Sequence, residues 1–374
     1  MQIKPAAFLR AALPVDLSQL PAMDDGRYHS LWIPDHMVSF WPDAIWTAEF
    51  TDLATTSHSP HRHVDAMAIA AAAAVLTKTV PIATSVVDTV RRHPAMLAQT
   101  ALTIDHLSKG RFILGVGSGE TENTVPYGFD FDKPVSRFEE ALKVIRLLWE
   151  TEGTVDFDGQ FYKLHHARLD TEPYEGRFPP IWIGCGGPRM LDIAGRYADG
   201  WWPTGVFTAE EYAAKLKVIH ESADRAGRDP GAITPCMIMP GFIGDDAELA
   251  EIMEAPLIKA YVMQIPAYAM RERGFAHPLG EDWRGIQDIN PGTMGREQLL
   301  DMIAKVRPEM ILECATHGTP KQVAKVVKSY IDAGLRVPKI VNNAAMAGLK
   351  YQARSAERVR ETEEELAILL GEAA

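Results

Sequence analysis

The sequence predicts a mixed α/β fold, a (β/α)8 TIM barrel, from two regularities. Short apolar runs of strand length alternate with helical periods through most of the 374 residues. Strand–helix–strand units repeated in this way imply right-handed crossovers and a parallel sheet with both faces covered. Eight candidate strands can be counted, and eight is the number that a closed parallel barrel needs. They span residues 6–9, 30–34, 80–85, 112–116, 180–184, 199–203, 236–243 and 338–343.

The helix before the last predicted strand has the clearest boundaries. Thr319 can cap it, Pro320 suits its first position, and Gln322 completes a capping box. Gly334 then ends the helix. Apolar residues at spacings of three and four predict further helices from residue 94 to 107 and from 138 to 149.

Two segments are too long to be plain connections between these elements. One follows the second predicted strand, and the other is rich in Pro, Gly, Met and aromatic residues. Segments of this kind usually form lids or substrate walls. We therefore expect a single domain over residues 1–374, with a loop elaboration at 37–63 and an insertion at 255–295, both at the C-terminal face of the barrel.

Composition and charge restrict the possible partners. The net charge of −12 argues against nucleic acid or an anionic membrane, so short basic clusters such as Arg91-Arg92 indicate local sites or solvated turns. Cys185, Cys236 and Cys314 form no C-x-x-C pair, which favours a reduced, cytoplasmic protein without disulfides or a metal site. The longest apolar run, residues 66–76, is too short to span a bilayer and indicates a buried helix. No integral membrane association is expected.

A glycine-rich segment carries a carboxylate to the end of one predicted strand. Residues 112–116 are apolar, and the motif G-x-G-x-G-E that begins at Gly115 ends at Glu120. The C-terminal ends of parallel strands are where chemistry is usually placed. The motif lacks the third glycine of the dinucleotide fingerprint, and no matching acid stands about 20 residues on to hold a ribose, so a nicotinamide site is disfavoured. A functional carboxylate and a plain turn with a solvated Glu both remain open.

Two neighbouring strand ends also carry polar groups. The strand at 30–34 is followed by Asp35-His36, where the histidine could be a general base or could merely cap a turn. The strand at 80–85 is followed by Val86-Val87-Asp88, which is either part of a site or an ordinary polar loop.

A second glycine-rich turn, Gly186-Gly187, starts the helix that follows the strand at 180–184. Free backbone N–H groups at a helix start can seat a phosphate, and Arg189 would add positive charge, although a simple tight turn is the alternative. Because several polar groups fall at the C-terminal strand ends of one barrel, we expect them to form a common site. They are His36, Ser85, Glu120 and the Gly186-Gly187 turn.

Taken in order, these motifs resemble the bacterial luciferase-like family, and specifically its branch that uses the 5-deazaflavin coenzyme F420. Each motif alone is weakly specific, but the ordered set extends over nearly the whole chain. The motifs are D-H at 35–36, A-T-S-V at 83–86, R-H-P at 92–94, G-V-G-S-G-E-T-E-N at 115–123, G-G-P at 186–188 and G-T-P at 318–320.

The resemblance implies that the deazaflavin lies across the C-terminal face of a luciferase-like barrel. It implies a cis peptide bond between Ser85 and Val86, which forms a bulge behind the cofactor ring. His36 would exchange the proton of the substrate hydroxyl, and Glu120 would lie near the ring nitrogen that gains or loses a proton. The implied contacts to the ring and ribityl chain are Asp35, Asp88, Ser118, Gly119 and Asn123, and those to the phosphate are Gly186, Gly187, Arg189 and Met190.

The resemblance further implies an oxidoreductase that transfers a hydride between the deazaflavin and a ketone or secondary alcohol. Residues 201–207 lack the lysine with which the family's sugar-phosphate dehydrogenases grip phosphate, so an apolar or bulky substrate is preferred. Four segments are similar to the mycobacterial phthiodiolone dimycocerosate ketoreductases, which favours a lipidic or otherwise apolar ketone. They are residues 126–128, 133–141, 277–283 and 287–291.

Two other functions remain open on the same scaffold. One is an FMN-dependent monooxygenase, in which reduced flavin reacts with oxygen. The other is a barrel that binds a flavin-like ligand without turning over a substrate. Since members of the family are often dimers, a homodimer is expected.

Overall fold

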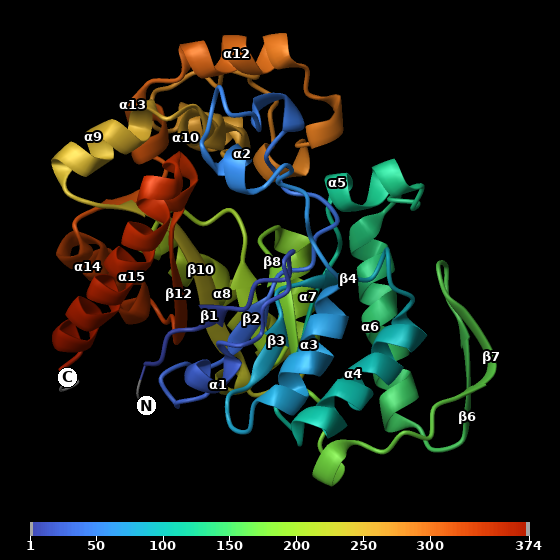
Figure 1. Ribbon diagram of the computed structural model, residues 1–374. Coiled ribbons are helices and arrows are strands. Elements are labelled where there is room, and N and C mark those ends of the chain that lie inside the picture. The colour runs from blue at the N-terminus through green and yellow to red at the C-terminus, as the bar shows by residue number, and fades with distance from the viewer. Residues whose placement is uncertain (1–2, 372–374) are drawn as a thin grey trace.

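The computed structural model describes residues 3–371 and forms a barrel of parallel strands surrounded by helices (Figure 1). Residues 1–2 and 372–374, which the expected single domain includes, lie outside the described part of the chain. The barrel strands pair in the order β1 (Ala7–Phe8), β2 (Leu31–Ile33), β3 (Ile82–Thr84), β5 (Phe112–Gly117), β8 (Ile181–Cys185), β9 (Gly200–Pro203), β10 (Thr234–Ile243) and β12 (Val337–Asn342).

The ring of strands is joined between its first and last members. The N–H of Ala6 donates a hydrogen bond to the carbonyl oxygen of Pro338 at 2.9 Å, which connects the start of β1 to β12. Each of the eight strands predicted from the sequence overlaps one of these barrel strands. The prediction of a (β/α)8 barrel is therefore confirmed.

Four further strands were not predicted. Strand β4 (Val87–Asp88) pairs with β5, and β11 (Thr316–Gly318) pairs with the end of β10; both are too short to give an apolar run. Strands β6 (Thr154–Asp158) and β7 (Lys163–Arg168) form an antiparallel hairpin that projects beside helix α6 (Pro134–Glu150) in Figure 1. Their side chains are mostly exposed, so the sequence shows no buried alternation there.

The predicted capping of α14 (Pro320–Asp332) is confirmed. Thr319 Oγ1 accepts a hydrogen bond from the N–H of Gln322, whose side chain accepts one from the N–H of Thr319, and Gly334 follows with a φ of +114°. The other helices are α1 (Leu20–Met23), α2 (Leu53–Thr56), α3 (Ala66–Leu76), α4 (Pro94–Ser108), α5 (Thr121–Thr124), α7 (Pro188–Tyr197), α8 (Ala209–Arg225), α9 (Asp246–Glu254), α10 (Pro256–Ala260), α11 (Ala267–Arg271), α12 (Arg296–Lys305), α13 (Pro308–Leu312) and α15 (Leu349–Leu369). Over residues 3–371, none of the helices has both the length and the apolar character needed to cross a membrane.

The interior of the barrel is filled by a compact group of side chains, to which each barrel strand or the residue beside it contributes. Three tryptophans dominate this group: Trp202 lies with its ring centroid 5.0 Å from that of Trp32 and 5.0 Å from that of Trp182. Since these indoles are buried, the barrel is a packed core rather than a channel. The remaining members are Ala6, Ala83, Ile113, Cys236 and Val337.

Gly115 allows this packing because it has no side chain. A Cβ atom at this position would overlap the carbonyl oxygen of Thr84 and lie 2.7 Å from the Trp202 ring. Gly115 also exchanges two hydrogen bonds with Thr84 Oγ1, at 2.8 and 3.0 Å, so the backbone cannot easily move away.

We expect Gly115→Ala to destabilise the fold by about 1–3 kcal/mol or more, because the added methyl group overpacks the barrel interior. Denaturant unfolding followed by circular dichroism measures the change. Gly295→Ala is the matched control, since a Cβ atom there meets nothing within 4 Å. Equal unfolding midpoints for the two variants would contradict the proposed packing constraint.

A second apolar cluster lies over the C-terminal ends of the strands. Helices α9–α13, which connect β10 to β11, pack there together with Ile45 and Leu53 from the segment 37–63. Figure 1 shows α2, α9, α10, α12 and α13 at the end of the barrel where α5 follows β5. We call this assembly, made of residues 37–63 and helices α9–α13, the cap.

Candidate active site

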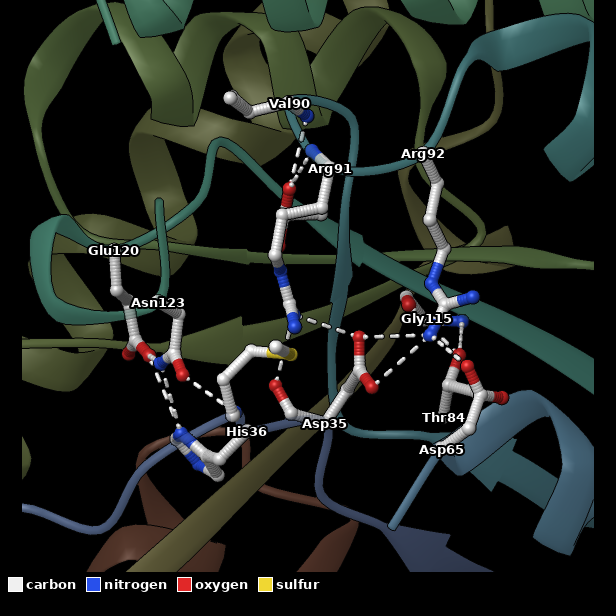
Figure 2. A network of polar contacts seen from close by, with 12 residues as sticks. Asp35, His36, Asp65, Thr84, Val90, Arg91, Arg92, Gly115, Glu120 and Asn123 are labelled. Carbon is white, nitrogen blue, oxygen red and sulfur yellow. Dashed lines mark hydrogen bonds and ion pairs between the residues drawn. The ribbon is translucent and has the colours of Figure 1, made fainter. Parts of the chain in front are cut away.

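Two polar side chains from different strands meet at the barrel mouth. His36 follows β2 and Glu120 follows β5, and Nδ1 of His36 lies 3.5 Å from Oε2 of Glu120. Figure 2 shows the two side chains pointing toward each other. Their exposed fractions of 22% and 37% leave both groups accessible to a ligand. The structure thus brings together the two predicted catalytic residues, while their roles stay predictions.

Asn123 of α5 links this pair to the backbone. Its Oδ1 accepts a hydrogen bond from the N–H of Met37 at 2.6 Å, which fixes the orientation of the amide. Its Nδ2 lies 3.2 Å from His36 Nδ1, 3.1 Å from Glu120 Oε2 and 3.0 Å from Glu122 Oε1. The side chain is buried, and it orients the acidic and imidazole groups around it.

The carboxylates of Asp35 and Asp88 are bound by arginine. Arg91 donates from Nη2 to Asp35 Oδ2 at 2.7 Å and from Nε to Asp88 (Figure 2). Arg92 Nη2 adds contacts to Asp35 at 3.2 Å and to Asp65 at 2.8 Å. The Arg91 side chain is 8% exposed, so it is not part of a solvated turn. Both acids were predicted to contact the cofactor, and that contact stays a prediction; the structure shows them holding Arg91.

The peptide bond between Ser85 and Val86 is cis, as the resemblance implies. The Val86 side chain packs where two glycines leave room: a Cβ atom at Gly117 would lie 3.0 Å from it, and one at Gly184 would lie 3.3 Å from it. Ser118 follows β5 directly and is only partly buried. These strand ends therefore form a small apolar platform at the end of the barrel that also carries His36 and Glu120.

Gly119 adopts a φ of +89°, a conformation that favours glycine. A Cβ atom there would lie 3.2 Å from the Phe131 ring and 3.3 Å from Val90. This turn redirects the chain after β5, so that Glu120 stands at the start of α5.

The first turn of α7 offers unoccupied backbone donors. Gly187 precedes the helix, no side chain caps its N–H groups, and a Cβ atom at Gly187 meets nothing within 4 Å. Gly186 is held close to Thr204, whose Oγ1 would lie 2.6 Å from an added Cβ atom. Arg189 is 58% exposed and contacts Glu139 at 3.3 Å, and Met190 is buried. An anionic group could bind at this helix start.

Sequence reasoning missed several groups around the pair. The His63 ring lies 5.6 Å from that of His36, and burial, with smaller effects of His36 and His61, lowers the pKa of His63 to about 4. The Phe40 ring meets His36 edge-on at 5.4 Å. Both come from the segment 37–63, and no local pattern marks them. Glu122 lies inside the quoted motif, but only the fold shows that it is buried.

The arrangement fits a flavin-like group with a phosphate. The platform formed by Val86 between Gly117 and Gly184 could support a planar ring, and the uncapped start of α7 could hold the phosphate. The imidazole of His36 and the carboxyl of Glu120 could exchange protons with bound molecules. One ring nitrogen of His36 and one carboxyl oxygen each of Glu120 and Glu122 lie within 4.8 Å of one another. This spacing is compatible with a bound cation or with a shared proton.

Comparisons with known proteins show which family the chain resembles in sequence and fold. Residues 23–336 match the family model of luciferase-like monooxygenases. A phthiodiolone/phenolphthiodiolone dimycocerosates ketoreductase of Mycobacterium tuberculosis is 37% identical over 326 residues, 84% of each chain. An F420-dependent glucose-6-phosphate dehydrogenase of Kineococcus radiotolerans is 29% identical over 306 residues, 78% of this chain and 80% of that one.

The fold has a close counterpart among solved structures. An F420-dependent secondary alcohol dehydrogenase in complex with an F420-acetone adduct gives a TM-score of 0.70 at 21% identity, covering 97% of this chain and 99% of that chain. The family match extends from before β2 to just beyond α14, and so includes the strand ends that carry His36, Glu120 and the Gly186-Gly187 turn. The chain therefore belongs to the luciferase-like monooxygenase family.

Proposed function

We propose that the protein is a coenzyme F420-dependent oxidoreductase that transfers a hydride between reduced deazaflavin and a ketone or secondary alcohol. The observation that carries the proposal is the His36–Glu120 pair, 3.5 Å apart, at the end of the barrel that also carries the Val86 platform and the uncapped start of α7. The names of the relatives support it, because two of them are F420-dependent and one is a ketoreductase.

The residues would hold the cofactor in three places. Val86 would support the ring, with Ser118, Gly119 and Asn123 along the ring and ribityl chain. The N–H groups at Gly186 and Gly187 would receive the phosphate, flanked by Arg189 and Met190. Asp35 and Asp88 would support the site through Arg91. When bound, the deazaflavin supplies two-electron hydride chemistry.

His36 and Glu120 would handle the protons of the reaction. The imidazole of His36 is oriented by Asn123 and would exchange the proton of the substrate oxygen. Glu120 would exchange the proton of the cofactor ring. The cap would exclude water and hold the substrate above the pair, which is the role we propose for the segments 37–63 and 255–295 of a single-domain chain.

The substrate is proposed to be apolar or lipidic. Residues 201–207 contribute no basic group, and Lys215 of α8, which reaches this segment, donates to the carbonyl oxygens of Thr204 and Gly205 at 3.1 and 2.7 Å. Lys215 is therefore engaged by backbone carbonyl groups and is not a free cation for a sugar phosphate at this strand end. The cap is built around an apolar cluster, and the 37% identical relative is a ketoreductase.

Two alternatives can be separated by direct binding. The family description favours an FMN-dependent monooxygenase as the second candidate, and a binding-only barrel is the third. We expect fluorescence titration of the purified protein to show tighter binding of F420 than of FMN, and anaerobic assays with reduced F420 to show reduction of apolar ketones. Tighter FMN binding with oxygen consumption would support the monooxygenase, whereas F420 binding without any turnover would support the third candidate. The homodimer and the cytoplasmic location stay predictions.

A substitution at Gly187 tests whether the start of α7 binds the phosphate of the cofactor. An aspartate there would cap α7 favourably, so the fold should be retained or gain up to about 1 kcal/mol, but its charge would repel a phosphate. We expect Gly187→Asp to weaken F420 binding by more than about tenfold, whereas Gly187→Asn, of the same size and neutral, weakens it less. Equal dissociation constants for the two variants would rule out a phosphate at this helix start.

A further inference from the structure

Glu122 is a fully buried carboxyl group to which the proposed reaction assigns no role. It lies in α5, one residue before Asn123, and its exposed fraction is 0%. Its Oε1 accepts a hydrogen bond from Asn123 Nδ2, but its Oε2 is buried and has no hydrogen-bond donor. A buried carboxylate oxygen without a donor costs free energy, so this atom needs an explanation.

The side-chain amide of Asn123 cannot donate a hydrogen bond to all three groups around it, which are His36, Glu120 and Glu122. We call these three groups and Asn123 the cluster. Asn123 Oδ1 accepts from backbone N–H groups at residues 37 and 38, so its Nδ2 must face the other way. That nitrogen carries two hydrogens, yet three polar atoms lie within 3.2 Å of it: the acceptors Glu120 Oε2 and Glu122 Oε1, and His36 Nδ1, which accepts or donates according to the tautomer. At least one of these groups must therefore be satisfied by a further proton.

The surroundings place that proton on Glu122. A carboxyl oxygen of Glu122 lies within 4.8 Å of one of Glu120, and because Glu122 is fully buried the two carboxylates cannot easily both be ionised. The cation that faces it, Arg91, is already paired with Asp35 and Asp88. The remaining titratable neighbour, His36, lies on the more exposed side of the cluster. Burial, followed by the charge of Glu120, raises the pKa of Glu122 to about 9.

We propose that Glu122 is a positioning residue that stays protonated at neutral pH and donates a hydrogen bond to Glu120, so that the two carboxyl groups share one proton and a single negative charge. Glu120 then remains an ionised acceptor with a fixed orientation. When Glu120 takes up a proton, the pair passes from one negative charge to none, and when it releases that proton the charge returns. This last consequence rests on the proposed function, but the protonation of Glu122 does not.

The proposal predicts how stability depends on pH. Because the pKa of Glu122 is raised in the folded protein from 4.5 to about 9, its contribution to stability is complete below the unfolded value and is lost as the pH rises toward the folded one. The folding equilibrium constant of the wild type, divided by that of Glu122→Gln, should fall by up to about tenfold per pH unit between about pH 5 and pH 9. Denaturant titrations of the two proteins measure this ratio.

Infrared spectroscopy observes the proton directly. At pH 7.5 the wild type should show the carbonyl stretch of a buried carboxylic acid, and Glu122→Gln should lack it. Asp105→Asn is the matched control: burial raises the pKa of that carboxyl only to about 6, so the band at pH 7.5 should persist in this variant. If Glu122→Gln does not fold, isotope-labelled glutamate in the unchanged protein shifts the band and identifies it as a glutamate.

Two results would overturn the proposal. One is a pH-independent stability ratio together with no protonated carboxyl band in the wild type at pH 7.5. The other is a divalent cation retained by the purified wild type in a one-to-one ratio and absent from Glu122→Gln, since a cation would satisfy the same oxygen atoms. Neither measurement uses cofactor or substrate, so the inference and the proposed function can fail separately.

Discussion

Replacing His36 by alanine is expected to lower the turnover of a ketone substrate by about a hundredfold to ten-thousandfold. The variant removes the imidazole that is proposed to exchange the proton of the substrate oxygen, 3.5 Å from Glu120. Because the side chain is partly exposed and its ring contacts are limited to Phe40 and His63, with polar contacts to Asn123 and Glu120, the free energy of unfolding should change by less than about 1 kcal/mol. Steady-state rates and denaturant unfolding of the same preparations measure the two effects.

His63→Phe is the matched control for this variant. The low pKa of His63, about 4, leaves its imidazole neutral in an ordinary assay, and no proton exchange is assigned to it. Its replacement should lower turnover less than about tenfold. Glu120→Gln, which keeps the shape of the side chain, should lose far more activity than stability, like His36→Ala. Wild-type rates in His36→Ala and Glu120→Gln would refute the assigned roles.

Replacing Arg91 by methionine is expected to destabilise the fold by about 3–5 kcal/mol. The guanidinium group is 8% exposed and pairs with both Asp35 and Asp88, whose side chains are also buried. Without it, two buried carboxylates lose their principal cation, and only Arg92 still contacts Asp35. Urea titration of the variant measures the loss.

Two further variants define the cause of this effect. Arg27→Met removes a pair with Asp25 that is about half exposed, and should cost no more than about 1 kcal/mol. Adding Asp35→Asn and Asp88→Asn to Arg91→Met removes the uncompensated charges and should restore part of the stability. If the triple variant is less stable than Arg91→Met alone, buried charge is not the reason for the loss.

The sequence could predict the barrel because its strands are continuous apolar runs that end in glycine or polar residues. It could also predict that His36 and Glu120 come together, because parallel strands place their C-terminal ends at one edge. It could not show that Arg91 is buried, since adjacent arginines in a βα loop resemble a solvated turn. Arg91 compensates the charges of Asp35, which follows β2, and of Asp88, which lies in β4. This pairing depends on the distance between the two strands, which no local sequence pattern predicts.

Other features of the site could not be predicted from the sequence, for different reasons. The resemblance marked Asn123 as a ring contact, but only the fold shows its amide nitrogen facing two carboxyl oxygens and an imidazole nitrogen at once. His63 and Phe40 reach His36 from a long segment without periodicity, where spacing gives no orientation. Nothing in the sequence marks Glu122 as buried, but the structure places it in the one-turn helix α5 with an exposed fraction of 0%.

Three tryptophans close the interior of the barrel below its C-terminal end. Trp32, Trp182 and Trp202 fill the interior, so a long acyl chain cannot extend downward along the barrel axis. The acyl chain of a proposed lipidic substrate would then have to lie between the barrel and the cap, so the cap would set any selectivity for chain length. If the proposed ketone chemistry is measured, exchanging the cap between related proteins should change which of the proposed ketone substrates react, while His36 and Glu120 keep their geometry.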